Sequence, residues 1–422
     1  SISWMKSVAW SYELFIQYFS LNRAFDSEIE LFQRFALHLH LGTINLKTGY
    51  DETGLGWKAL GVTAATTATR NLTALFDWIV DKNPNVKHIN PVVVGDSFEK
   101  RMNLCAYQHR RSKAMLGNTW LATKEEIESA RMSGRQRKGT TENKEPPSFP
   151  EEHFERLLLE GFRVGKKHSL REILIVLLLH CGGFRESEPF QLFAGDVIPD
   201  PDNYLKAMVL IHHPQRGLAP SDWRDEKGRP IHGTRRDYLQ AKFGMLPRNE
   251  ILGTRHAGWK PRIHEAEYGS EFLRTYWFEP WWGEFFLAVW YKYLAQILLL
   301  ERKHPFAFVN IGRAPIGDMY KVGKFNDAHA DAVSRIGLEV SKAAGTTPHG
   351  HRHAYAQRLR KGKVDENLVR RAMHHSSVAS QEIYTAPSLE EVMKCLQEAT
   401  ANLDRSASAS ASSHKLMEIL IH

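Results

Sequence analysis

The chain has 422 residues, of which 42% are hydrophobic and 25% charged, as in an ordinary soluble globular protein of two or three domains. Its formal net charge of +8 favours a polyanionic partner, although the excess is modest for this length. Three widely spaced cysteines without a C-x-x-C pair exclude a disulfide framework and a thiolate zinc site. The longest apolar runs fall well below the ~18–20 residues of a spanning helix. No signal-peptide pattern opens the chain, so we expect a reducing compartment, the cytosol or the nucleus.

The first third of the sequence predicts helices. In the segment 26–42, Ser27 and Glu30 form a capping-box pattern, an apolar stripe follows at helical spacing, and Gly42 can end the helix. The segment 69–83 repeats this stripe, and a further helix is expected near 119–131. These stripes predict the core of a helical amino-terminal domain over residues 1–130.

Residues 131–150 are polar, basic and end in prolines, which is typical of an interdomain linker. Two interpretations stay open, a solvated linker and a basic strap lying on a phosphate backbone. For the strap, the candidate DNA-binding residues are Arg131, Arg135, Arg137 and Lys138.

The remainder predicts a mixed domain over 151–405, followed by a flexible spacer and tail over 406–422. We expect helices at 151–163, 169–181 and 281–303 and again from 322 onward, strands at 206–213 and 275–280, and an extended piece at 305–310. The segment from 214 to about 268 is rich in Gly, Pro and Arg, and residues 213–242 are equally compatible with a DNA-contacting insertion and with a solvated loop. The tail can dock on its own chain or on a neighbouring protomer.

Four short motifs in this second domain carry chemistry. They are Gly183-Phe184-Arg185-Glu186-Ser187-Glu188, then Pro348-His349-Gly350-His351-Arg352-His353, then His375-Ser376-Ser377, then Ile383-Tyr384-Thr385. Zinc binding by the histidines is disfavoured, because H-x-H-x-H lacks the i, i+4 spacing of a helix face and no H-E-x-x-H or cysteine partner accompanies it.

The ordered motifs resemble the tyrosine recombinase and integrase family, most clearly over residues 151–395. The resemblance implies a mainly α fold with a small antiparallel sheet (α+β), in which a helical core-binding domain and a catalytic domain form a C-shaped clamp. It also implies a lysine on a β-hairpin between the two arginines, for which Lys260 is the first candidate and Lys242 the second. The family usually has glycine where this chain has His374.

Elementary chemistry supports the same residues. Metal-free phosphodiester cleavage needs charge neutralisation, a nucleophile and an acid for the leaving group. Arg185 and Arg352 would neutralise the phosphate, and His375 would add a hydrogen bond to it. His349 would accept or relay the proton of the nucleophile Tyr384.

The other polar residues of these motifs receive supporting roles. We expect Glu188 to orient Arg185 or a neighbouring histidine, and His353 to make hydrogen bonds in the core or beside the site. His351 exceeds what the chemistry requires, and we expect it to face solvent.

The predicted activity is site-specific DNA cleavage and rejoining, of the integrase or transposase kind, through a 3′-phosphotyrosyl intermediate, with no metal and no cofactor. The predicted partners are double-stranded DNA and three further protomers, in a homo-tetramer assembled on two DNA sites. Accessory proteins are compatible with this scheme and a membrane is not expected. A bacterial protein of this kind would be cytoplasmic and nucleoid-associated. Two alternatives remain, a type IB topoisomerase-like enzyme and a non-catalytic DNA-binding accessory protein of a mobile element.

Overall fold

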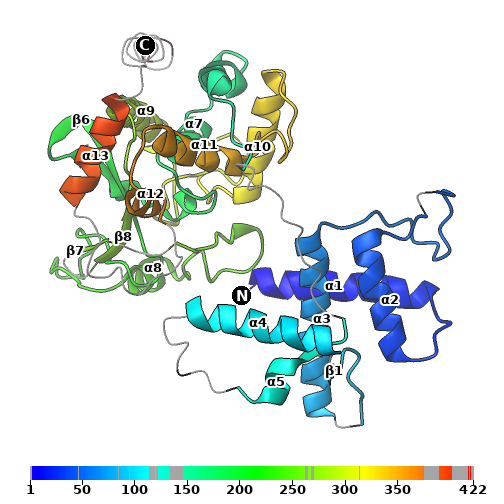
Figure 1. The fold of residues 1–422 in the computed structure, drawn as a ribbon. Coiled ribbons are helices and arrows are strands. Elements are labelled where there is room, and N and C mark those ends of the chain that lie inside the picture. Colours follow the sequence, from blue (N-terminus) through cyan, green and yellow to red (C-terminus); the bar gives the residue numbers. More distant parts are fainter. Residues whose placement is uncertain are drawn as a thin grey trace. The chain divides into compact units, whose positions relative to one another are not determined.

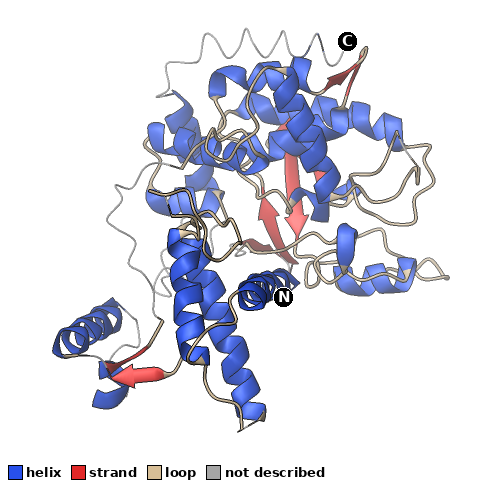
Figure 2. Cartoon of the chain, turned by 90° about the vertical axis from the view of Figure 1, so that its right-hand side faces the viewer, coloured by secondary structure: helices blue, strands red, loops and turns tan. Residues whose placement is uncertain are grey.

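The structure is a computed structural model that describes most of the chain. The described residues are 2–45, 47–83, 85–94, 96–113, 119, 122–133, 146–261, 265–267, 270–312, 314–374, 389–401, 417 and 419. They form two compact units, Ser1–Lys144 and Glu145–His422, and the boundary falls inside the predicted linker 131–150. Helices dominate and the sheets are small and antiparallel, so the predicted α+β class is confirmed (Figure 1, Figure 2).

The amino-terminal unit is built on α1 (Ile2–Leu21), α2 (Glu28–Leu41) and α3 (Val62–Lys82). Apolar side chains at helical spacing make its core; those that are buried are Phe15, Tyr18, Leu31, Phe32, Phe35, Leu39, Ala65, Ala68, Leu72 and Ile89. The unit also contains α4 (Ser97–Lys113), α5 (Lys124–Glu128) and an antiparallel pair of β1 (Val92–Val94) and β2 (Ser129–Arg131).

Helix starts in this unit follow the sequence only in part. Ser27 caps α2 by accepting the Glu30 amide proton at 3.2 Å, as predicted, and Gly42 ends that helix at a φ of 79°. The helix predicted at 69–83 begins earlier, at Val62. The seven residues before 69 extend its apolar face, with Ala65 and Ala68 buried. The helix predicted near 119–131 is present but short, since α5 covers only Lys124–Glu128 and the chain then enters β2.

The carboxy-terminal unit surrounds helix α7 (Leu170–His180), in which every residue but Arg171 is buried. This helix contacts α9 (Pro280–Ile297), α10 (Val322–Arg335) and α11 (Pro348–Lys361). Beside them lies a four-stranded antiparallel sheet in the order β5-β6-β8-β7. Its strands are β5 (Val197–Asp200), β6 (Asn203–His212), β7 (Glu265–Glu267) and β8 (Ser270–Arg274). The unit further contains β3 (Arg163–Val164), β4 (Lys167–His168), α8 (Arg235–Phe243), α12 (Glu366–Ala372) and α13 (Leu389–Ala401), besides several helical segments of three to five residues.

Three predicted elements of this unit differ in the structure. The helix expected at 151–163 ends at Gly161 and changes type along its length. It is a 3-10 helix over Glu151–His153, an α-helix over Phe154–Arg156 and a π-helix over Leu157–Gly161. The strand expected at 275–280 is wrong, since β8 ends at Arg274 and the aromatic residues that follow enter the core. One more backbone bond joins the Thr275 amide to the Val209 carbonyl at 3.1 Å, and beyond it the indole of Trp277 donates to the Ala207 carbonyl at 2.7 Å. The extended piece at 305–310 makes only isolated bridges, to Phe193 and Met319.

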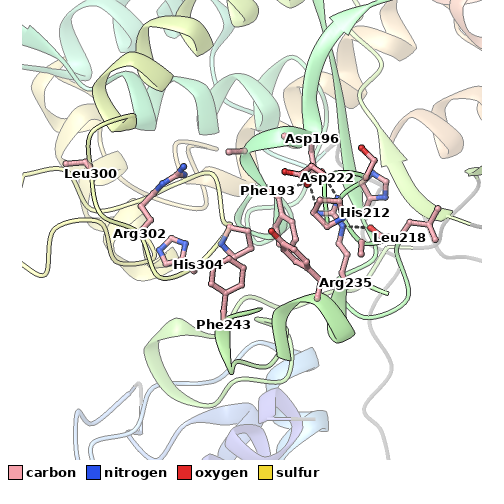
Figure 3. A pocket seen from close by; sticks show the side chains of 17 residues that line it. Phe193, Asp196, His212, Leu218, Asp222, Arg235, Phe243, Leu300, Arg302 and His304 are labelled. Carbon is pink, nitrogen blue, oxygen red and sulfur yellow. Dashed lines mark hydrogen bonds and ion pairs between the residues drawn. The ribbon is translucent and has the colours of Figure 1, made fainter. Parts of the chain in front are cut away.

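The turn-rich segment between β6 and β7 is a packed insertion. Helix α8 begins at Thr234, which caps it with Asp237, and its Arg235 forms a buried ion pair with Asp196 at 2.8 Å. The guanidinium of Arg235 also lies 4.1 Å above the ring of Phe193. Figure 3 shows Arg235 and Asp196 facing each other at one side of a pocket of about 770 Å³. The insertion is therefore fastened to the body of the unit by a buried charge pair and an aromatic contact.

Within the described ranges, no helix combines the length and the apolar character that crossing a membrane demands.

Candidate active site

Helix α11 has two different faces, and the polar residues of the motif at 348–353 are divided between them. One face carries residues at the helical spacing i, i+3, i+4, i+7, i+8 and i+11, and all of them line a pocket of about 750 Å³; they are His349, Arg352, His353, Ala356, Gln357 and Arg360. The opposite face carries His351, Tyr355 and Leu359, which are buried. Pro348 stands at the first position of the helix, where its missing amide proton costs nothing.

Arg185 reaches the same pocket from the turn that follows α7. Gly183 adopts a φ of 69° in this turn, and a Cβ atom there would overlap the ring of Tyr355. The close approach therefore requires glycine. The turn is closed by Glu188, whose carboxylate accepts the backbone amide of Arg185 at 2.8 Å and its Nη1 at 2.9 Å. The side chain of Arg185 keeps 22% of its surface exposed, on the pocket side.

Arg352 is held by backbone carbonyls. Its Nη1 donates to Gly183 O and its Nη2 to Met373 O, and the residue is only 3% exposed. Burial lowers the pKa of Arg352 to about 10, with Glu188 acting to raise it and Arg185 to lower it further. The guanidinium therefore stays charged at neutral pH, and the carbonyls fix its plane.

Glu188 lies where the sequence places an orienting carboxylate. Its side chain is buried beside both arginines. Burial raises the pKa of the Glu188 carboxyl, while the charges of Arg352 and Arg185 oppose that shift. The 2.9 Å contact with Nη1 of Arg185 makes this carboxylate the partner that sets the direction of the Arg185 side chain.

His349 and His353 lie side by side at the rim of the pocket, with ring centroids 4.6 Å apart in an edge-to-face arrangement. Partial burial lowers the pKa of His349, and the charges of Arg352, Arg185 and Lys342 lower it further. Burial, His349 and Arg352 have the same effect on the pKa of His353. Both imidazoles are therefore neutral at neutral pH, and each has a lone pair that can accept a proton.

His351 does not face solvent, and that expectation is wrong. It is buried between two other histidines, with its Nδ1 3.0 Å from Nδ1 of His180 and its Nε2 2.8 Å from Nε2 of His329. His180 continues this chain to Glu151, which also binds Arg358 at 2.8 Å. The motif thus combines three pocket residues, His349, Arg352 and His353, with one member of a buried polar chain, His351.

Several predicted site residues are not brought to the pocket. Lys260 is exposed and does not line it, and Lys242 lies 5.3 Å above the ring of Tyr238 on α8. Arg131 makes a bidentate ion pair with Asp77 of α3 and donates to the Asn90 carbonyl, which fixes β2 to α3 within the amino-terminal unit. His375, Tyr384, Arg135, Arg137 and Lys138 lie outside the described residues.

Arg360 and Arg370 also line the pocket and were missed in the sequence. A signal for Arg360 existed, because it lies eight residues after Arg352 on a helix and so returns to the same face. With them, four arginines and two histidines line the pocket, and none of the described lining residues is a carboxylate. Such a pocket is suited to an anion with several oxygen acceptors. In the described part of the chain, no group of three or more histidine, cysteine or acidic side chains could hold a metal ion.

Comparison with known proteins gives only weak similarity. No protein-family model matches the chain, and no curated protein matches it. The chain is similar to a solved structure described as XerH site-specific recombinase bound to palindromic difH substrate in a post-cleavage complex. In that comparison the identity is 16%, the TM-score is 0.45, and 92% of this chain and 78% of the other are covered.

Two further solved structures are similar to the chain. One is XerA recombinase, at 13% identity and a TM-score of 0.30, covering 94% of this chain and 92% of the other. The other is XerH bound to difH substrate in a pre-cleavage complex, at 14% identity and a TM-score of 0.34, covering 87% and 93%. Similarity at this level assigns no activity, so the case for function rests on the pocket.

Proposed function

We propose that the protein is a site-specific DNA recombinase that cleaves and rejoins DNA through a tyrosyl phosphodiester. One observation carries the proposal: Arg185 and Arg352 are fixed by backbone carbonyls and a buried carboxylate, and both open onto a pocket with no carboxylate among its described lining. The sequence supports it with His375 and Tyr384, which follow Arg352 in the order of the family motifs.

The proposed reaction is a transesterification. The Tyr384 oxygen forms a bond to phosphorus while the bond to the 5′ oxygen breaks, which leaves a 3′-phosphotyrosyl link and a free 5′ hydroxyl. His349 accepts the tyrosine proton, and Lys260 protonates the departing 5′ oxygen. Arg185, Arg352 and His375 stabilise the extra negative charge of the five-coordinate phosphorus. The link conserves the energy of the bond, so the reverse attack by a 5′ hydroxyl rejoins the strands. Two duplexes and four protomers complete an exchange.

Tyr384→Phe is expected to abolish a covalent protein–DNA adduct, because the phenyl ring has no oxygen to attack phosphorus. The wild-type protein is incubated with a pool of nicked duplexes of randomised sequence, and adducts that survive denaturant are isolated and sequenced. Tyr204→Phe, which removes the hydroxyl of an exposed tyrosine on β6, serves as the matched control and should retain the adduct. An adduct that persists in Tyr384→Phe would show that another residue is the nucleophile.

The same assay separates the alternatives. An adduct with relaxation of supercoiled DNA but no strand exchange would favour a type IB topoisomerase-like enzyme. Salt-sensitive DNA binding without any adduct would favour a non-catalytic accessory protein.

Lys260→Ala is expected to slow cleavage of ordinary DNA by about 10²–10⁴-fold, the usual contribution of a positioned acid. Cleavage should recover on DNA with sulfur in the 5′ bridging position, because a thiolate leaves without protonation. Single-turnover rates on the two substrates measure this, with Lys242→Ala as the control. Equal rates for Lys260→Ala and wild type on ordinary DNA would remove Lys260 from the mechanism.

A further inference from the structure

His374 occupies a backbone conformation that histidine rarely adopts. Its φ is 51°, in the left-handed region, where a side chain with a Cβ atom is disfavoured by about 1–2 kcal/mol. The residue follows α12 and is only 1% exposed, so the polar imidazole is not there to contact solvent. A strained residue of this kind persists only where the surrounding structure holds it in place.

The contacts of this turn lead to the two arginines. The carbonyl of His374 accepts Nη1 of Arg185 at 3.2 Å, and the carbonyl of the preceding residue, Met373, accepts Nη2 of Arg352. The left-handed turn therefore directs two successive carbonyls toward two guanidinium groups. Carbonyl oxygens bind the arginines without neutralising them, so only the Glu188 carboxylate offsets their charge, and the two guanidinium groups keep a net positive charge for an anion in the pocket.

The imidazole of His374 fixes this turn to two other elements. Its Nε2 lies 3.0 Å from the carbonyl of Arg274 at the end of β8, and the ring stacks on Phe184 with a centroid distance of 5.0 Å. Phe184 immediately precedes Arg185, and β8 belongs to the sheet beside the insertion that carries Lys260. A glycine at this position would adopt the same φ without strain but would make neither contact.

We propose that His374 is a positioning residue for the arginine pair. Its ring contacts the end of β8 and Phe184, and these contacts fix the turn at 373–374. The fixed turn holds the carbonyls of Met373 and His374 where they orient Arg352 and Arg185 toward the scissile phosphate. The inference rests on the proposed cleavage reaction. It assigns to His374 no contact with DNA and no proton transfer.

The test uses His374→Ala and His374→Gly in the full chain. His374→Ala removes the ring but keeps the unfavourable φ, whereas His374→Gly removes the ring and relieves the strain, so it remains folded if the alanine variant does not. Both variants should cleave ordinary DNA more slowly by about 10²-fold, the usual effect of a small misplacement of a catalytic group. Urea unfolding of each variant, with the free energy extrapolated to water, accompanies the rates.

Two readouts distinguish positioning from a general loss of structure. The first is DNA with a methylphosphonate at the scissile position, which carries one negative charge less and needs less help from an arginine; the defect should shrink there to about the same extent as that of Arg185→Ala. The second is a double-mutant cycle, in which His374→Gly should cause a smaller loss when added to Arg185→Ala than when added to wild type, because only Arg352 is then left to be misplaced.

The outcomes separate the inference from the proposed function. Wild-type cleavage with wild-type rates in both His374 variants overturns the inference alone. A defect that is equal on both substrates and additive with Arg185→Ala also overturns it, because it would mean a general structural role. A wild-type protein that forms no adduct on any DNA overturns the proposed function and the inference together.

Discussion

Arg352→Ala is expected to lower the single-turnover rate of DNA cleavage by about 10³-fold, as the loss of a group that stabilises transition-state charge does in other active sites. It should also reduce the free energy of unfolding by about 2–5 kcal/mol, because the carbonyls of Gly183 and Met373 lose their donors in a buried place. Arg352→Lys keeps the charge but not the planar fork, so it cannot bind both carbonyls and a phosphate at once. We therefore expect it to cleave almost as poorly as the alanine variant.

The matched control is Arg360→Ala, two helical turns further along the same face of α11. Arg360 is exposed and holds no backbone carbonyl among the described residues, so its loss should leave the free energy of unfolding within about 0.5 kcal/mol of wild type. Cleavage rates on a suicide duplex and urea unfolding curves measure both effects. Cleavage by Arg352→Ala within tenfold of wild type would contradict the role given to Arg352.

The motif around Arg352 shows what the sequence could predict. The types of residue at 349 and 352 indicated phosphate chemistry, and the structure puts both at one pocket with Arg185. The order of the motifs could not say which histidine faces the pocket. That depends on where the helix begins: with Pro348 as its first residue, His351 falls on the buried face with Tyr355. Helical spacing counted from Arg352 would have placed His353 on the same face as Arg352 and His351 on another face.

Other features depend on contacts between distant parts of the chain, and no local pattern reveals them. The partner of His351 on one side is 171 positions earlier, and Arg185 meets the carbonyl of His374 across 189 positions. The strand predicted at 275–280 failed for the same reason, since a run of aromatic residues, Tyr276, Trp277 and Phe278, fits a buried irregular segment as well as a strand. The sequence also did not predict that the insertion containing α8 packs against the body of the unit. Glycine and proline indicate turns, but they do not indicate whether those turns pack against other residues.

Lowering the pH from 7 to 5 is expected to destabilise the protein strongly through its buried histidines. Burial lowers the pKa of His329 to about 3 and that of His351 well below 6.5, with the neighbouring histidines adding to the effect at His351. The unfolded chain therefore binds more protons than the folded chain once the pH falls below about 6.5. Each such histidine then costs about 1.4 kcal/mol of stability per pH unit. Glu151 does not offset this loss: burial acts to raise its pKa, but Arg358 and His180 hold it well below its usual range, so it stays ionised throughout this window.

His329→Gln tests this account, because glutamine can still hydrogen-bond to His351 but does not titrate. Free energies of unfolding from urea curves between pH 7.5 and 5 should fall less steeply for this variant than for wild type, by about 1.4 kcal/mol per pH unit below pH 6.5. His232→Gln, which changes an exposed histidine of the insertion, should follow the wild-type slope. If His329→Gln keeps the wild-type slope, the acid sensitivity does not come from this buried chain. A shallower slope would mean that His329 is neutral in the folded protein, as its burial beside His351 implies.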